Sequence, residues 1–212
     1  MYDKYFEPIR EKKLKVLEIG LGCDMVRLVQ QVTSGACCVL TIPQHYGPGA
    51  SYYTWLDYFP NVELYYIEAD AACAEKWTDK TAAATVFSGD QADRAFLQRF
   101  VEESGGHFDI IIDDGGHSMN QQRTSFEELF GIVKPGALYC VEDLQTSYLP
   151  AYDGDSTGGK DPNVPTMMKY IYQLIDDKMA DGDQHVFSKD IRGIDCMRQV
   201  CCIDKKEVGS PS

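Results

Sequence analysis

Residues 108–117 read Phe-Asp-Ile-Ile-Ile-Asp-Asp-Gly-Gly-His, and the predicted fold is built around this stretch. Three consecutive isoleucines without a polar break predict a strand that is buried on both faces, as in parallel sheets. In an open α/β sheet, ligands bind outside the carboxyl ends of the strands, so Asp113, Asp114 and His117 stand where chemistry is expected. An ordinary polar turn with an aspartate capping the next helix is the alternative, because Asp-Gly-Gly suits a turn.

Strand-like and helix-like segments alternate along the rest of the chain. This alternation predicts a doubly wound, mostly parallel α/β sheet with an antiparallel edge hairpin, in one domain that spans residues 1–206 and is followed by a tail. Besides the central strand, strands are expected at 13–22, 62–70, 85–90 and 137–143, and helices at 51–59 (capped by Ser51), 71–77, 92–103, 119–130 and 166–179. A turn is expected at 133–136, a lid loop at 147–165 and a closing hairpin within 185–206.

The composition limits the classes of function. A formal charge of −13 argues against a nucleic-acid binder, which needs a basic face to neutralise phosphates. No apolar run approaches the length of a membrane span, and the N-terminal residues do not resemble a signal peptide. The expected protein is therefore a cytoplasmic enzyme with a small substrate, without a nucleic-acid or membrane partner.

Eight cysteines raise the question of a disulfide scaffold. Cys140, Cys196, Cys201 and Cys202 lie in apolar, strand-like runs, which is typical of small buried hydrophobic residues. Cys37 and Cys38 are adjacent and no Cys-x-x-Cys pair occurs, so a zinc site is not expected. We therefore expect the cysteines to be reduced, as in the cytosol.

Acidic residues follow one predicted strand after another. One such acid alone is typical of a helix cap, but a series lines one edge of the sheet. Ribose hydroxyls and an exocyclic amine of a nucleoside favour carboxylate acceptors, and a hard cation such as Mg²⁺ favours oxygen ligands. The first strand also ends in a Glu-x-Gly-x-Gly turn, where the backbone can approach a ligand. The acids are Glu18, Glu68, Asp90, Asp113, Asp114, Glu142 and Asp143.

Seven short motifs then give a resemblance that spans nearly the whole chain. The sequence resembles class I S-adenosylmethionine-dependent methyltransferases and their Rossmann-like sheet. Within them it is similar to the metal-dependent sugar O-methyltransferases of macrolide biosynthesis and their fungal relatives. The pair DDGGH and EDLQTSY is much more specific to this branch than the glycine turn. The matching motifs are LEIGLGC, YGPGAS, YYIEAD, FSGDQAD, FDIIIDDGGHS, KPG and VEDLQTSY.

The resemblance implies a role for each site residue. Glu18, Gly20 and Gly22 would form the loop under the methionine part of the cofactor, with Tyr46, Gly47 and Gly49 as its second half. Glu68 would hold the ribose hydroxyls and Asp90 the adenine amine. Asp114, Glu142 and Asp143 would bind Mg²⁺, and His117 would be the general base. For Asp113 the resemblance allows two roles: contact with the cofactor, or support of the residues that bind the metal.

The implied reaction is Mg²⁺-assisted methylation of a hydroxyl on a small molecule, a sugar or a secondary metabolite, and homo-oligomerisation is left open. Two alternatives stand beside it. A catalytically inactive protein could keep the fold, because the cofactor loop is interrupted. A nicotinamide-dependent oxidoreductase shares the glycine turn and the ribose acid, but it does not account for Asp-Asp-Gly-Gly-His or for the Glu-Asp pair.

Residues 26–44 interrupt the loop that should cradle the cofactor. This segment has no acidic residue in an otherwise acidic chain, and joining Met25 to His45 restores a continuous loop, GLGCDMHYGPGAS. Its ends can encode splice signals: GTACGT for Val-Arg, CTGAC within Leu-Thr, and a final CAG for Gln. We therefore interpret it as an aberrant insertion, a translated, unspliced intron. A tolerated surface loop is the alternative, since long insertions cost little loop-closure entropy.

Deleting residues 26–44 should restore cofactor binding, because the deletion rejoins the two halves of the glycine loop. Calorimetric titration with S-adenosylmethionine should give tighter binding for the deletion variant than for the chain as written. Equal affinity of the two proteins, or a major spliced transcript that carries the segment, would contradict the intron interpretation.

Overall fold

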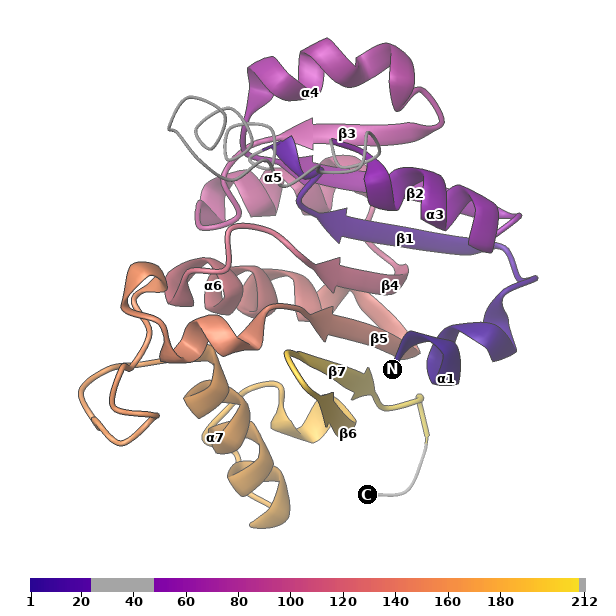
Figure 1. Ribbon diagram of the computed structural model, residues 1–212. Helices are drawn as coiled ribbons and strands as arrows, with labels where there is room; N and C mark the ends of the chain where they lie inside the picture. The colour runs from indigo at the N-terminus through magenta and orange to yellow at the C-terminus, as the bar shows by residue number, and fades with distance from the viewer. Residues whose placement is uncertain (24–47, 210–212) are drawn as a thin grey trace, which may run out of the picture.

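A seven-stranded, mostly parallel sheet forms the centre of the computed structural model, which describes residues 1–23 and 48–209 (Figure 1). The strand order is β3-β2-β1-β4-β5-β7-β6, with β1 to β5 parallel and β7 antiparallel to both of its neighbours. The predicted doubly wound sheet with an edge hairpin is confirmed. The strands are β1 Leu14–Ile19, β2 Val62–Glu68, β3 Ala84–Ser88, β4 Phe108–Asp113, β5 Val133–Val141, β6 Ile191–Met197 and β7 Val200–Lys205.

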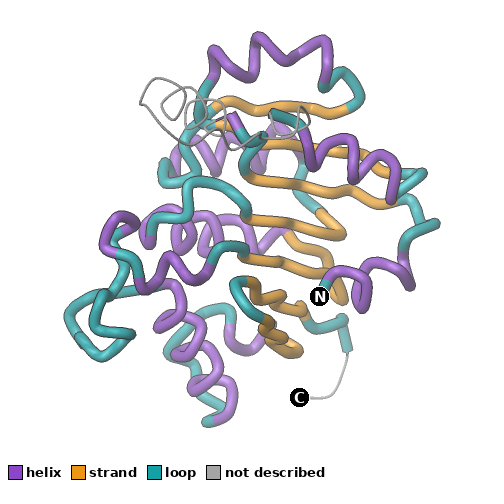
Figure 2. Tube along the Cα trace, viewed as in Figure 1, coloured by secondary structure: helices purple, strands orange, loops and turns teal. Residues whose placement is uncertain are grey.

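Helices cover both faces of the sheet (Figure 2). Aromatic residues of α1 and α3 pack on one face, and apolar residues of α5, α6 and α7 pack on the other. The helices are α1 Tyr2–Phe6, α3 Ala50–Tyr58, α4 Ala71–Trp77, α5 Arg94–Ser104, α6 Met119–Leu129 and α7 Met167–Met179. Short 3₁₀ turns are η1 Glu7–Ile9, η2 Thr78–Lys80, η3 Phe130–Ile132, η4 Leu144–Tyr148, η5 Pro150–Tyr152 and η6 Ser188–Asp190.

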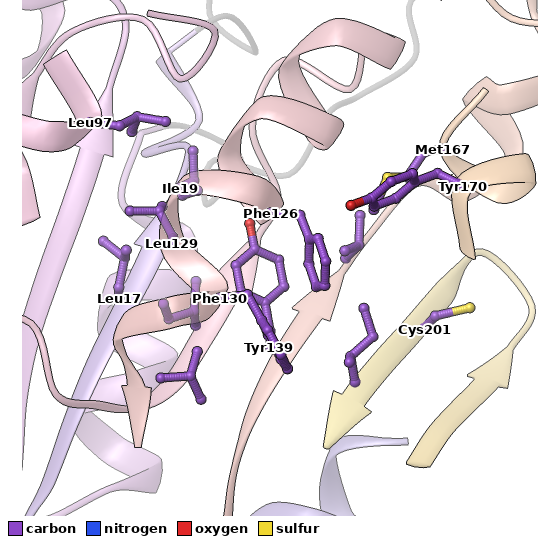
Figure 3. Packing of buried hydrophobic residues seen from close by; sticks show 14 of the residues in the cluster. Leu17, Ile19, Leu97, Phe126, Leu129, Phe130, Tyr139, Met167, Tyr170 and Cys201 are labelled. Atoms are coloured by element: carbon purple, nitrogen blue, oxygen red, sulfur yellow. The ribbon is translucent and has the colours of Figure 1, made fainter. Parts of the chain in front are cut away.

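The central strand β4 is buried on both sides, as its isoleucines predicted. Ile111 joins the core under α5, α6 and α7, of which Figure 3 shows a close view, whereas Ile110 and Ile112 join the core under α1 and α3. All three side chains are fully buried. Each contributes about 1.5–3 kcal/mol relative to an exposed position, so β4 is held by both cores.

Two local predictions were wrong. Gly49, in the left-handed conformation (φ +82°), is the N-cap of α3, and Ser51 lies inside the helix with its Oγ 3.2 Å from the Tyr66 hydroxyl. Residues 133–136 belong to β5 instead of forming a separate turn, because Val133 pairs with Phe108 across a register shift. In both places a tertiary partner decides the local structure.

The expectation of reduced cysteines is also wrong in this structure. Disulfides join Cys23 to Cys73, Cys140 to Cys202 and Cys196 to Cys201. Cys140 faces Cys202 across β5 and β7, and Cys196 faces Cys201 across the β6–β7 hairpin. These pairs follow from a strand register that the sequence alone does not reveal. In the part of the chain that is described, no helix is long and apolar enough to cross a membrane.

The segment 147–165 is an ordered loop, held by a buried carboxylate. Asp155 is 1% exposed and accepts hydrogen bonds from Thr157, from the backbone N–H of Asp161 and from Lys169 Nζ on α7 at 2.9 Å. Hydrogen bonds, first from Thr157 and then from Lys169, lower the pKa of Asp155 below its ordinary value. The loop is thereby attached to α7 beside the carboxyl end of β5; its role as a lid stays a prediction.

Candidate active site

The loops after β1 and β4 touch each other at the carboxyl edge of the sheet. The Asp114 N–H donates to the Ile19 carbonyl at 3.0 Å, and a Cβ added to Gly20 would lie 2.2 Å from the Asp114 carbonyl oxygen. Gly20 also has a φ of +98°, which side-chain-bearing residues rarely adopt. Gly20 is therefore needed for contact between the two loops, in addition to any approach of a ligand.

Asp114, His117 and Asp143 form a compact cluster just beyond β4 and β5. Their candidate ligand atoms all lie within 4.8 Å of one another. His117 Nε2 is 3.3 Å from Asp143 Oδ2 and 3.9 Å from Asp114 Oδ1. Both His117 (φ +59°) and Asp143 (φ +53°) have left-handed backbones, a costly conformation that concentrates at functional sites. His117 Nδ1 is buried without a hydrogen-bond partner among the described residues.

Glu142 lies beside this cluster but is not part of it. Its Oε1 accepts a hydrogen bond from the Tyr2 hydroxyl, and its backbone carbonyl accepts one from Gln122 Nε2 at 2.9 Å. The resemblance implied that Glu142 binds the metal together with Asp114 and Asp143. The structure brings the two aspartates together with His117 and leaves Glu142 next to them, paired with Tyr2.

The carboxylates crowd one another electrostatically. Burial, reinforced by Glu142 and then Glu18, raises the pKa of Asp114 to about 8. Burial also raises the pKa of Glu142, although its hydrogen bond from Tyr2 opposes the shift. A negatively charged pocket of this kind binds a cation readily, because bound positive charge removes the mutual repulsion.

Asp113 is part of a buried hydrogen-bond network that supports the loop after β4. It is fully buried and accepts hydrogen bonds from Gln91 Nε2 (2.8 Å), Ser125 Oγ (2.6 Å) and the Tyr139 hydroxyl (3.3 Å). Gln91 Oε1 in turn accepts from the backbone N–H of Gly116. Sequence reasoning missed Gln91; its only signal was its position directly after Asp90 in FSGDQAD.

Glu18 is likewise buried under its loop. It is 2% exposed and accepts a hydrogen bond from Trp55 Nε1 at 2.9 Å. Burial raises its pKa to about 7, while hydrogen bonds from Tyr66, Ser51 and Trp55 oppose the shift. The structure thus places Glu18 behind the glycine loop. No sequence motif pointed to Trp55, Tyr66 or Ser51 as its partners.

The acids after β2 and β3 lie at the same edge. Glu68 accepts from the backbone N–H groups of Leu21 (3.0 Å) and Asp70 (2.8 Å), so it already joins the first two loops. Asp90 is exposed and accepts from the backbone N–H of Ala92. A carboxylate has about four acceptor positions, so these bonds leave room for ligand hydroxyl or amine groups.

The two described ends of the interrupted loop lie together. The Gly49 N–H donates to the Leu21 carbonyl at 2.8 Å, and a Cβ on Gly22 would lie 3.9 Å from Pro48 Cα. Gly22 and Gly49 both have positive φ values, as a tight glycine loop needs. Tyr46, Gly47 and the predicted insertion at 26–44 lie outside the described residues.

A shallow cavity of about 290 Å³ lies next to the cluster, between η4, α7 and the β6–β7 turn. Gln145 connects the two, because it lines the cavity and its Nε2 donates to Asp143 Oδ1 at 3.0 Å. Gln145 Oε1 is buried without a hydrogen-bond partner in the described part of the chain. Met168 and Met197 line the apolar side of the cavity, and Arg198 lines its polar side.

No family model matches the chain, but individual known proteins are similar to it. The chain is 32% identical over 177 residues to 8-demethyl-8-(2-methoxy-alpha-L-rhamnosyl)-tetracenomycin-C 3'-O-methyltransferase of Streptomyces olivaceus, which covers 84% of this chain and 39% of that protein. It is 35% identical over 159 residues to demethylmacrocin O-methyltransferase of Streptomyces fradiae, covering 75% and 34%. The solved structure of MycE methyltransferase with Mg, SAH and mycinamycin VI superposes with a TM-score of 0.76, at 28% identity over 97% of this chain and 48% of that one.

The chain belongs to the class I S-adenosylmethionine-dependent methyltransferases and has their Rossmann-like fold. Within that class, the homologues of this chain are macrolide and sugar O-methyltransferases, so the resemblance drawn from the motifs is confirmed. The chain spans only 39% and 34% of the length of the two curated relatives, and about half of the solved structure.

Replacing Gly20 with alanine should disrupt the site much more than the same change at Gly22. Both substitutions add a Cβ at a positive φ, which costs roughly 1–2 kcal/mol, but only the Cβ at position 20 would meet a backbone oxygen, at 2.2 Å. Urea unfolding should therefore show a clearly larger loss of free energy of unfolding for Gly20→Ala. Equal losses would mean that the loops do not meet as described.

Proposed function

We propose that this chain transfers the methyl group of S-adenosylmethionine to a hydroxyl oxygen of a small molecule, with Mg²⁺ assistance. The observation that carries the proposal is the cluster of Asp114, His117 and Asp143 beside the glycine loop. An oxygen–carbon bond forms as the sulfur–carbon bond breaks, and the hydroxyl proton passes to His117. The curated relatives, which methylate sugar hydroxyls by their names, support this reaction class.

The residues present fit both groups that the reaction needs. Asp114 and Asp143 offer the hard oxygen ligands that Mg²⁺ prefers, and Glu142 stands next to them. The cofactor would lie along the edge formed by the carboxyl ends of β1, β2 and β3. The residues at this edge are Gly20 and Gly22 after β1, Glu68 at the end of β2 and Asp90 after β3. When bound, the cation lowers the pKa of an acceptor hydroxyl and the cofactor supplies an electrophilic methyl group.

The chain itself would place the base and keep it in position. His117 is held by the loop that Gln91 and Asp113 support, and its Nε2 faces Asp143 at 3.3 Å. An imidazole in that position can accept a proton, and the neighbouring carboxylates stabilise the imidazolium that results. The buried support fixes the donor–acceptor geometry, which supplies much of the rate enhancement in such reactions.

The cavity beside Gln145 is suited to the rest of the acceptor. Its methionines present adaptable apolar surface, and Gln145 and Arg198 add polar side chains to its lining. An amphipathic acceptor, with an apolar body and hydroxyls at one edge, satisfies both features. Mycinamicin VI and demethylmacrocin, taken from the names of relatives, are therefore the first acceptors to test.

Incubation with methyl-labelled S-adenosylmethionine and hydroxylated acceptors, beginning with these two, should give Mg²⁺-dependent label transfer. Chelation with EDTA should abolish transfer, and Asp114→Asn should weaken the dependence on Mg²⁺ without unfolding the sheet. Asp57→Asn, at an exposed position of α3 that belongs to neither the cation cluster nor the cofactor edge, serves as the control. Transfer that survives exhaustive chelation would contradict the metal-assisted reaction.

His117→Ala should lower turnover by about 10²–10⁴-fold, because the variant has no group to take the hydroxyl proton. The affinity for S-adenosylmethionine, measured by calorimetry, should stay nearly unchanged. Unchanged turnover would contradict the assignment. A parallel loss of Mn²⁺ affinity would instead make His117 a metal ligand, which its position 3.3 Å from Asp143 also permits.

A further inference from the structure

Tyr2 reaches the candidate cation site from the opposite end of the sequence. Its hydroxyl donates a hydrogen bond to Oε1 of Glu142, 140 residues away, and the contact is partly buried. Figure 1 shows the N-terminus near β5, the strand that ends just before Glu142. None of the site motifs in the sequence includes Tyr2, and the reaction proposed above does not use it.

The packing of α1 fixes the Tyr2 ring independently of Glu142. The ring stacks on Phe6, with centroids 4.8 Å apart and an angle of 8° between the planes. It also meets the edge of Trp55 at 6.0 Å. Phe6 is 1% exposed, and the Trp55 N–H is bound to Glu18. A buried aromatic cluster therefore holds the Tyr2 hydroxyl next to Glu142. Because the Tyr2 side chain is already ordered by this packing, forming the hydrogen bond costs little further conformational entropy.

The surroundings of Glu142 make an orienting donor important. Besides burial, the negative charges of Asp143 and Asp113 raise the pKa of Glu142, and the charge of Glu142 raises the pKa of Asp114, so these carboxylates repel one another. A carboxylate free to rotate would turn away from them, and a cation would then have to reorder it. A hydrogen bond to one oxygen leaves the other available, and such supporting bonds to ligands commonly change metal affinity by about 10–100-fold.

We propose that Tyr2 is a positioning residue of the cation site, which holds Glu142 beside Asp114 and Asp143. This inference rests on the cation site of the proposed function. Under this inference α1 contributes a residue to the cation site, although the acidic residues of the site all come from the ends of strands. Two other roles are possible for the same contact: it could only attach α1 to the sheet, or it could hold Glu142 away from the cation.

The test is the affinity of the full chain for Mn²⁺, a spectroscopic substitute for Mg²⁺, followed by electron paramagnetic resonance of the free ion. Tyr2→Phe removes only the hydroxyl and keeps the ring stacked on Phe6. It should weaken Mn²⁺ binding by about 10-fold or more. Tyr5→Phe is the matched control, because the Tyr5 hydroxyl on the same helix binds Asp195 at 3.0 Å instead of a site residue. The control should bind Mn²⁺ as the unchanged chain does.

A second comparison separates positioning from simple attachment of the helix. In a Glu142→Gln background, the Tyr2→Phe change should have little further effect on Mn²⁺ affinity, because its partner carboxylate is already gone. If Tyr2→Phe weakens binding equally in both backgrounds, Tyr2 acts through the helix and the inference is overturned. Unchanged or tighter binding by the single variant would also overturn it.

The outcomes also separate this inference from the proposed function. If Asp143→Asn weakens Mn²⁺ binding and Tyr2→Phe does not, the cation site stands and only the role of Tyr2 is wrong. If the unchanged chain and Asp143→Asn both fail to bind Mn²⁺, the cation site itself is wrong, and the role of Tyr2 is overturned with it.

Discussion

The contact between the glycine turn after β1 and the Asp114 carbonyl is the constraint on which the site depends. Neighbouring parallel strands bring their carboxyl ends to one edge, but contact between the loops needs a position without a side chain. Gly20 provides it, and the Ile19–Asp114 hydrogen bond closes the same junction. Because the loop that carries Asp114 and His117 rests on the loop that faces the cofactor edge, a shift in one loop would move both halves of the site.

The second constraint is unbalanced charge. In residues 1–23 and 48–209, no lysine or arginine forms an ion pair with Asp114, Glu142 or Asp143. Basic side chains pair with acids elsewhere, as Lys134 does with Asp109. The protein instead supports its site acids with neutral donors such as Tyr2 and Gln145. Neutral donors orient a carboxylate without cancelling its charge, which keeps the site attractive to a divalent cation.

Much of the fold followed from local patterns, because the isoleucines of β4 and the acids at strand ends reflect burial and strand polarity directly. What the sequence could not show depends on pairing between distant segments. The Cys140–Cys202 bridge needs the β5–β7 register, and the position of Gly49 at the start of α3 is held by its hydrogen bond to Leu21. For the site, the motifs gave Asp114, His117 and Asp143, but not Tyr2 or Gln91, because an isolated tyrosine or glutamine carries no pattern until the fold brings it to its partner.

The hydrogen bond between Gly49 and Leu21 has a consequence for how the fold tolerates changes in chain length. It joins the loop after β1 to the residue that precedes α3, whereas β1 pairs with β2 and β4 through residues 14–19, all of them before Leu21. The described strand pairs therefore do not depend on how many residues connect Leu21 to Gly49. A change in that length acts on the glycine turn at the cofactor edge and leaves the register of the sheet as it is.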